Sequence, residues 1–136
     1  MPRKAIPWPE LFAAAADARA NAYAPYSKFE VGAAVYVQGG EIAAGCNVEN
    51  ASYGLSLCAE RNAIACAISR YGRRRLLALA IVTDTPEPSP PCGVCRQVMA
   101  EFAKPDLPVR CRNVEGKERR FTLGRLLPHA FSSRYL

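Results

Sequence analysis

The sequence contains very little histidine and tryptophan: His129 and Trp8 are the only residues of these types among 136. We expect both residues to be structural and assign them no role in a site. The chain also lacks an apolar run of about 18 residues, the length that a membrane-spanning helix requires. Near the N-terminus, Pro7 and Pro9 interrupt the continuous apolar stretch of a secretory signal. We therefore expect a soluble, cytoplasmic protein that does not contact a membrane.

The proportions of hydrophobic and charged residues are those of an ordinary globular protein. Half of them are hydrophobic and 22% are charged, and a chain of this length can form a core without disulfides. No internal repeat or shift in composition divides the sequence. We therefore expect one domain spanning residues 1–136.

Basic residues outnumber acidic ones, 18 to 12, which gives a formal net charge of +6. Such an excess can attract a polyanion, although exposed arginines more often form a solvated surface. Aromatic residues are not interleaved with the arginines, so the stacking half of a single-strand-binding surface is missing. We therefore do not expect a nucleic-acid partner.

Six cysteines raise the alternative of a secreted disulfide framework. However, Cys46, Cys58 and Cys66 fall within a predicted strand or helix rather than within loops, so we do not expect disulfides. We interpret Cys46, Cys66 and Cys111 as small, buried apolar side chains. The other three cysteines form a separate pattern, considered with their neighbours below.

Hydrophobic periodicity divides the chain into helices and strands. We expect helices over residues 9–22, 58–71, 92–103 and 123–127, the last one capped by Thr122, and strands over residues 29–37, 41–47, 76–83, 107–112 and 119–121. The first two strands form a hairpin. The last two are joined by too few residues for a parallel crossover and should pair antiparallel. The expected fold class is α/β: a three-layer α/β/α sandwich with a five-stranded mixed sheet and helices on both faces.

The cysteines Cys58, Cys92 and Cys95 each lie in or just before the first turn of a predicted helix. A helix N-terminus lowers the pKa of a nearby thiol and so favours the thiolate that a metal needs. A structural zinc site usually has four protein ligands, whereas a catalytic site has three and leaves one position to water. Three ligands therefore predict a catalytic site with one Zn²⁺ per subunit. The Cys-x-x-Cys spacing also suits a thioredoxin-type redox pair, but that alternative leaves Cys58 and Glu60 without a role.

Two charged residues follow Cys58 closely. Glu60 lies about 200° around the helix from Cys58, which places it poorly for the same metal and better beside a bound water. A carboxylate there can accept the proton of the water and pass it to a leaving group. Three thiolates and Zn²⁺ sum to a charge of −1, and we expect Arg61 to compensate it by donating to the ligand sulfurs.

Longer motifs extend the pattern over nearly the whole chain, and together they resemble the small, homotetrameric, zinc-dependent cytidine deaminases. The matching segments are Tyr23-Ala24-Pro25-Tyr26-Ser27-Lys28-Phe29, Val31-Gly32-Ala33-Ala34, Gly45-Cys46-Asn47-Val48-Glu49-Asn50-Ala51-Ser52-Tyr53, Cys58-Ala59-Glu60-Arg61, Pro91-Cys92-Gly93-Val94-Cys95-Arg96-Gln97 and Leu126-Leu127-Pro128-x-x-Phe131. The resemblance implies hydrolytic deamination of cytidine and deoxycytidine to uridine and deoxyuridine plus ammonia, by a zinc-activated water, in pyrimidine salvage. Glu60 would be the proton shuttle, and the zinc ligands would be Cys58, Cys92 and Cys95.

The resemblance also implies how a nucleoside would be bound. Asn47 and Glu49 match residues that hydrogen-bond the ribose, Phe29 matches one that packs on the base, and Ala59 would contribute a backbone contact to the pyrimidine. Two further positions match residues that enter the pocket of a neighbouring subunit, which implies a homotetramer with shared active sites: Tyr53 and Phe131.

Three other functions stay open on the sequence alone. A deaminase of the same fold could act on a cytosine-bearing antibiotic, although Asn47 and Glu49 favour an unmodified ribose. A nucleic-acid editor would suit the net charge but must admit a strand, whereas a nucleoside pocket encloses the ribose. A zinc module without catalytic activity would retain its metal and give Glu60 no chemical role.

Overall fold

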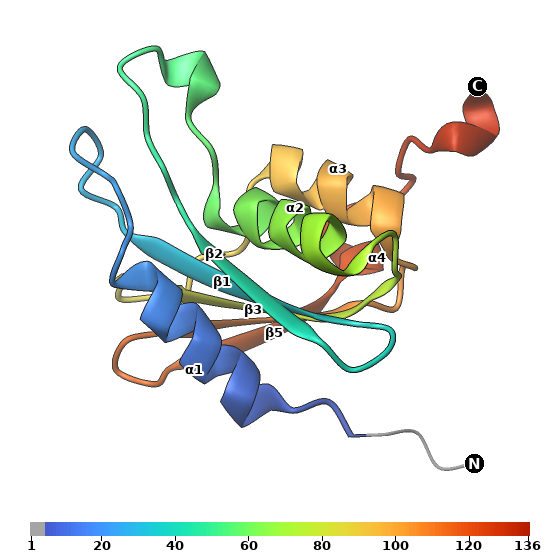
Figure 1. Ribbon diagram of the computed structural model, residues 1–136, viewed down its shortest axis with the longest axis horizontal. Helices are drawn as coiled ribbons and strands as arrows, with labels where there is room; N and C mark the ends of the chain where they lie inside the picture. The colour runs from blue at the N-terminus through green and yellow to red at the C-terminus, as the bar shows by residue number, and fades with distance from the viewer. Residues whose placement is uncertain (1–4) are drawn as a thin grey trace.

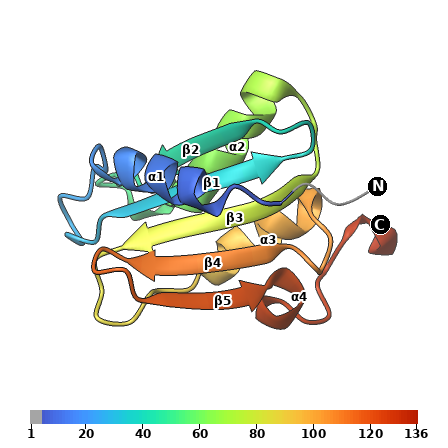
Figure 2. The ribbon, with the colours of Figure 1, turned by 90° about the horizontal axis from the view of Figure 1, so that it is seen from below.

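Five strands form one mixed sheet, whose order across the sheet is β2-β1-β3-β4-β5 (Figure 2). The computed structural model describes residues 5–136, so the first four residues of the predicted domain lie outside the described part. The strands are β1 (Val31–Val37), β2 (Ile42–Cys46), β3 (Leu76–Thr83), β4 (Pro108–Asn113) and β5 (Glu118–Thr122). Only the β3–β4 pair is parallel. The predicted mixed sheet, its hairpin and its antiparallel last pair are confirmed.

Helices cover both faces of this sheet, as the sandwich prediction requires. Helix α1 (Trp8–Arg19) lies on one face, and helices α2 (Ala59–Tyr71) and α3 (Gly93–Phe102) lie side by side on the other (Figure 1). A short helix α4 (Leu123–Leu126) follows β5. Single 3-10 turns are formed by Tyr53–Leu55 and Ser133–Tyr135. None of the helices in the described part of the chain is long and apolar enough to cross a membrane.

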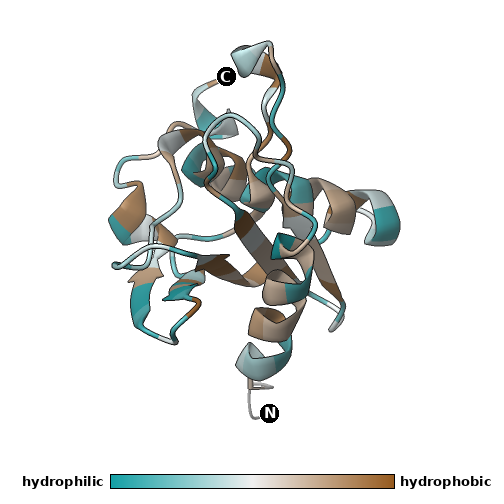
Figure 3. Ribbon diagram, turned by 90° about the vertical axis from the view of Figure 1, so that its left-hand side faces the viewer, coloured by the Kyte–Doolittle hydropathy of each residue, from teal (hydrophilic) through white to brown (hydrophobic). Residues whose placement is uncertain are grey.

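The sheet separates two apolar cores because alternate strand residues point to opposite faces. The α1 side contains Leu11 and Ala80, and the side of α2 and α3 contains Ile64, Leu79 and Met99. Figure 3 shows brown, hydrophobic residues in the strands at the middle of the molecule, whereas the helices carry both hydrophobic and hydrophilic residues. Strand β3 lies in the middle and is almost entirely buried, as a strand covered on both faces should be.

The chain leaves the sheet twice at the same end and enters a helix each time. The segment after β2 leads to Cys58, the residue that precedes α2, and the segment after β3 leads to Cys92, which precedes α3. Both cysteines have an extended backbone, so each thiol is held at the first turn of its helix. At its other end α2 is closed by Gly72, whose φ of 82° is a conformation that favours glycine.

Three local predictions are corrected. The first helix ends at Arg19, because Ala22 donates its N–H to the carbonyl of Arg19 in a tighter turn. Thr122 precedes α4 but its side chain makes no capping hydrogen bond, since it is also the last residue of β5. All six cysteines are free, which agrees with the absence of predicted disulfides, but Cys46 and Cys66 are only half-buried.

Candidate metal centre and substrate pocket

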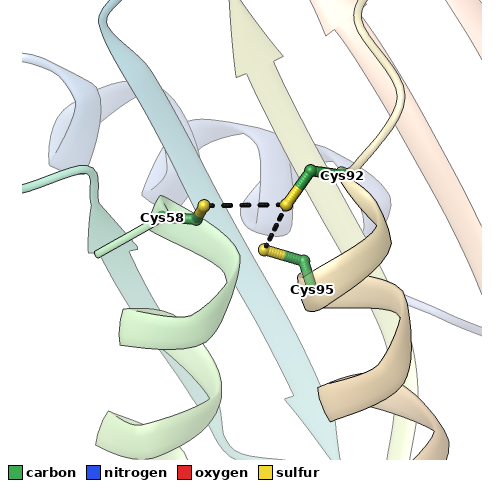
Figure 4. Close-up of side chains that lie close together, drawn as sticks. All are labelled: Cys58, Cys92 and Cys95. Carbon is green, nitrogen blue, oxygen red and sulfur yellow. Dashed lines mark hydrogen bonds between the residues drawn. The ribbon is translucent and has the colours of Figure 1, made fainter. Parts of the chain in front are cut away.

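Three sulfur atoms converge between the first turns of α2 and α3 (Figure 4). The Sγ atom of Cys92 lies 3.8 Å from that of Cys58 and 3.6 Å from that of Cys95. All three sulfurs lie within 4.8 Å of one another. The structure thus brings together the three cysteines that the sequence predicts as ligands. They come from the starts of two helices that lie side by side, although strand β3 separates them along the chain.

The spacing of these sulfurs fits zinc. Tetrahedral zinc with Zn–S bonds of about 2.3 Å holds its ligand sulfurs about 3.8 Å apart. The observed separations of 3.8 and 3.6 Å match this value without rearrangement. Three thiolates are also a set of ligands that zinc prefers. Cys58, Cys92 and Cys95 are therefore suited to hold one zinc ion and leave one coordination position open.

The close sulfur atoms change the acidity of two thiols. Hydrogen bonding from Cys95, followed by that from Arg61, lowers the pKa of Cys58 to about 5. The contact with Cys58, together with burial, raises the pKa of Cys95. The site therefore stabilises negative charge on Cys58 first, and a divalent cation among the sulfurs would favour the thiolate form of all three.

Arg61 lies beside this cluster, one turn into α2. Its Nη2 donates to the carbonyl oxygen of Ser56 at 3.0 Å and lies 3.8 Å from the Sγ of Cys58. The contact with Cys58 raises the pKa of Arg61, so the guanidinium stays charged. This is the position expected of a cation that offsets the charge of the thiolates, and that role stays a prediction.

Glu60 is buried on the same helix turn, with only 5% of its surface exposed. Burial raises the pKa of its carboxyl group to about 7. Glu60 lines the same cavity as Cys58 and Cys92. A carboxyl group with a pKa near neutrality, next to a metal site, can both accept and donate a proton.

A cavity of about 320 Å³ opens beside the sulfurs and Glu60. Its volume lies in the range of small-molecule sites. The predicted substrate residues that line it come from the strand ends and the start of α2: Phe29, Asn47, Glu49 and Ala59. Two larger hollows, of about 450 and 570 Å³, lie elsewhere and contain none of the predicted site residues.

Asn47 connects the two strands of the hairpin at the edge of this cavity. Its Oδ1 accepts the N–H of Val31 at 2.9 Å, and its Nδ2 donates to the carbonyl oxygen of Phe29 at 2.6 Å. Within residues 5–136 the Nδ2 group has no second acceptor, so its other hydrogen can be donated to a ligand. Sequence reasoning gave Asn47 a binding role only, whereas the structure shows that it also shapes the strand that carries Phe29.

Glu49 is held by the turn that precedes Phe29. Its carboxylate accepts the N–H groups of Tyr26 and Ser27, at 3.0 and 3.1 Å, and the hydroxyl of Ser27. The Ser27 hydroxyl is the main reason that the pKa of Glu49 is lowered. Glu49 therefore presents a fixed negative charge at the cavity. Phe29 forms another part of the wall and keeps 39% of its surface exposed.

Tyr53 and Phe131 lie outside the cavity of their own chain. Their surfaces are 74% and 58% exposed, which is unusual for large apolar side chains. Tyr53 contacts the ring of Tyr26 edge-on, and Phe131 stacks on Tyr135. The structure therefore brings these two predicted residues to the surface and not to the zinc ligands.

Several cavity residues were not assigned a role from the sequence. Three of them are Thr83, the last residue of β3, and Ser89 and Pro90 in the loop that follows it. Ser27 lies in a segment that resembles the family, but nothing in the sequence around it indicates a hydrogen bond to Glu49. Long-range contacts of this kind depend on the tertiary fold and are not visible in a spacing pattern.

Comparisons with known proteins agree with this geometry. Residues 8–111 match the family model described as the cytidine and deoxycytidylate deaminase zinc-binding region. The chain is 50% identical over 119 residues to the cytidine deaminase of Halalkalibacterium halodurans, covering 88% of this chain and 89% of that relative. It is 48% identical over 130 residues to the cytidine deaminase of Mycobacterium tuberculosis, covering 93% and 90% of the two chains.

Solved structures give the same result. The crystal structure of cytidine deaminase from Burkholderia pseudomallei superposes with a TM-score of 0.87 at 48% identity, covering 93% of this chain and 100% of that one. That from Mycobacterium leprae has a TM-score of 0.79 at 42% identity, with coverages of 92% and 100%. The chain therefore belongs to the cytidine and deoxycytidylate deaminase family, whose zinc-binding region it shares.

Proposed function

We propose that this protein deaminates cytidine and deoxycytidine, giving uridine and deoxyuridine plus ammonia in pyrimidine salvage. The observation that carries the proposal is the buried Glu60 carboxyl group, which lines a cavity of about 320 Å³ together with two of the three clustered cysteines. In the reaction a water oxygen forms a bond to C4 of the cytosine, the C4–amino bond breaks, and ammonia leaves.

Each part of the site has a role in this reaction. Cys58, Cys92 and Cys95 would hold the zinc ion, which when bound would lower the pKa of a water molecule and so make it a nucleophile at neutral pH. Glu60 accepts a proton from the water and returns it to the departing amino group, a transfer that its pKa of about 7 favours. Burial excludes bulk water, which strengthens these electrostatic interactions.

The other end of the cavity suits a ribose and a base. Asn47 offers an amide hydrogen, and the carboxylate of Glu49 can accept from hydroxyl groups. Phe29 presents an apolar face to the pyrimidine ring, and Ala59 lies at the start of α2, where its backbone N–H has no partner within the helix.

The charge of the cavity favours a nucleoside over a nucleotide. No lysine, arginine or histidine of residues 5–136 lines it, and Glu49 contributes a negative charge. A 5′-phosphate would find no cation there and would be repelled. We therefore expect kcat/KM for deoxycytidine to exceed that for deoxycytidine 5′-monophosphate by roughly a hundredfold or more, since an unpaired buried charge costs several kcal/mol.

A homotetramer in the cytoplasm, with shared active sites, completes the proposal. Tyr53 and Phe131 are exposed at 74% and 58% and are free to enter a neighbouring subunit. Exposed aromatic side chains of this kind are typical anchors of protein interfaces. Six free thiols, three of them clustered as ligands, suit a reducing compartment.

A substrate panel tests this function against its alternatives. Purified protein of known metal content is mixed with cytidine, deoxycytidine, a cytosine-bearing antibiotic nucleoside, deoxycytidine 5′-monophosphate and a cytosine-containing oligonucleotide, and ammonia release is measured. Release from the two nucleosides supports the proposal. Robust deamination within the oligonucleotide would identify a nucleic-acid editor instead, and Asn47→Ala and Glu49→Gln variants that turn over cytidine normally would remove the ribose assignment.

A further inference from the structure

The loop between β3 and α3, residues 84–92, forms part of the cavity wall but has little structure of its own. Ser89 and Pro90 line the cavity, and Cys92 ends the loop. Residues 84–91 contain four prolines, which have no N–H to donate. No backbone-to-backbone hydrogen bond is formed by residues 84–91. The position of the wall must therefore be fixed by side chains.

Asn113, the last residue of β4, supplies such a contact. It is only 4% exposed. Its Nδ2 donates to the carbonyl oxygens of Thr85 and Pro86 at 3.1 and 3.2 Å, and its Oδ1 accepts the N–H groups of Glu115 and Lys117 at 3.1 and 2.8 Å. Both ends of the amide are thus used, one toward the loop and one toward the β4–β5 turn.

Other contacts also hold the loop. In its first half, the hydroxyl oxygens of Thr83 and Thr85 lie 2.9 Å apart, and the Thr85 hydroxyl donates to the carbonyl oxygen of Glu87. Arg96 donates from Nε to the carbonyl oxygen of Pro91 at 2.7 Å, which fixes the end next to Cys92. An ion pair joins Glu87 to Lys117, but both side chains are more than half exposed, and such pairs contribute little. Asn113 is therefore a buried side chain that ties the first half of the loop to the β4–β5 turn.

We propose that Asn113 is a positioning residue for substrate binding, which acts by fixing the wall formed by Ser89 and Pro90. The inference rests on the proposed function, because the substrate concerned is the nucleoside. Asn113 pairs with Thr83, the last residue of β3, so its amide holds Thr85 and Pro86 directly after the chain leaves the sheet. An amide is required there, since only it offers donors to one side and an acceptor to the other.

The substitution Asn113→Asp separates the donor role of the amide, toward the loop, from its acceptor role, toward the β4–β5 turn. The carboxylate keeps the acceptor for Glu115 and Lys117 but turns an oxygen toward the carbonyl groups of Thr85 and Pro86. We expect KM for cytidine, and Kd for the product uridine by calorimetry, to rise roughly tenfold or more, because small displacements of positioning groups have large effects. Zinc content should be unchanged.

A second variant, Asn113→Ser, is measured in parallel. Its side chain is smaller and also keeps an acceptor, so the proposal can still be tested if the Asn113→Asp protein does not fold.

Val109→Ala is the matched control, since Val109 is fully buried in the same strand and pairs with Leu79, four residues before the end of β3. It should lose stability while keeping the wild-type KM and uridine Kd. Wild-type KM and Kd in a folded Asn113 variant, or an equal rise in the Val109 variant, would overturn the proposal. If the wild-type protein releases no ammonia from cytidine, the proposed function fails, whereas uridine binding still tests Asn113 separately.

Discussion

At the scale of single residues, the environment of Arg61 gives it a measurable role. Its guanidinium lies 3.8 Å from the Sγ of Cys58 and 3.0 Å from the carbonyl of Ser56. Three thiolates around zinc leave one excess negative charge, which would oppose ionisation of a bound water. We predict that Arg61→Ala keeps its zinc but loses roughly 10- to 100-fold in kcat/KM, the range typical for partners of metal ligands.

The control for this prediction is Arg70→Ala, at the far end of the same helix, where the exposed Arg70 side chain lies over the ring of Tyr71. It should keep wild-type kinetics. Metal content is measured on each sample by atomic absorption. Unchanged kinetics in Arg61→Ala would remove this residue from the mechanism.

Cys111 gives a second prediction at this scale, on stability rather than activity. Burial raises the pKa of its thiol from 9.0 to about 12. Between these values the unfolded chain has lost the proton and the folded chain still holds it, so the free energy of unfolding falls as the pH rises from 9 toward 12. The slope due to this group is at most about 1.4 kcal/mol per pH unit.

Urea unfolding at pH 8 and pH 10.5 checks this effect. Cys111→Ala should be less stable at pH 8, because a buried group is lost, but should show a smaller further decrease at pH 10.5 than the wild type. An equal decrease in both proteins would show that other groups cause the alkaline loss of stability.

At the scale of elements, the contact between β2 and α2 determines where Cys58 lies. A Cβ atom added at Gly45 would come within 2.6 Å of the backbone nitrogen of Ala63 and 2.9 Å of the carbonyl carbon of Asn62. We predict that Gly45→Ala costs about 1–3 kcal/mol, since overpacking forces the backbone to shift. Thermal unfolding should show a Tm lower by several degrees.

Gly54→Ala is the comparison, because a Cβ atom at Gly54 meets no atom within 4 Å. Its Tm should stay within about a degree of the wild type, as is usual for open surface positions. A Gly45→Ala protein with an unchanged Tm would show that α2 can move away from β2 without loss, contrary to the packing described above.

The helices and strands were largely predictable from the sequence. Hydrophobic periodicity predicted every strand, because this signal depends on local chemistry. The three cysteines and Glu60 were predictable because each has a fixed place relative to a helix start. Asn113 was not, since its importance comes from two segments that only the tertiary fold brings together.

The arginines show the same limit. The sequence suggested that aromatic rings and arginines are not interleaved, yet Arg110 lies over the ring of Trp8 at 4.1 Å and Arg112 over that of Phe12 at 3.8 Å. These stacks join α1 to β4, which are far apart in the chain. Because these rings are covered by arginines of the same protein, the stacks favour a structural role over base stacking.

At the scale of the whole molecule, the exposed aromatic residues predict an assembly. We expect a native mass of about four times 14.8 kDa by light scattering. The double substitution Tyr53→Ala and Phe131→Ala should raise KM and weaken the assembly, because the pocket would lose residues supplied by a neighbour. A fully active monomer would contradict the shared site.

The central claim is that Glu60, beside zinc held by three cysteines, moves protons during deamination of cytidine. Its most direct test is ammonia release and loss of cytidine absorbance, measured for the wild type and for Glu60→Gln with the zinc content determined on the same samples. We predict about one zinc per chain in both proteins, equal amounts of uridine and ammonia from the wild type, and at least a hundredfold lower kcat in the variant. A Glu60→Gln protein that keeps its zinc and deaminates cytidine at the wild-type rate would contradict the account.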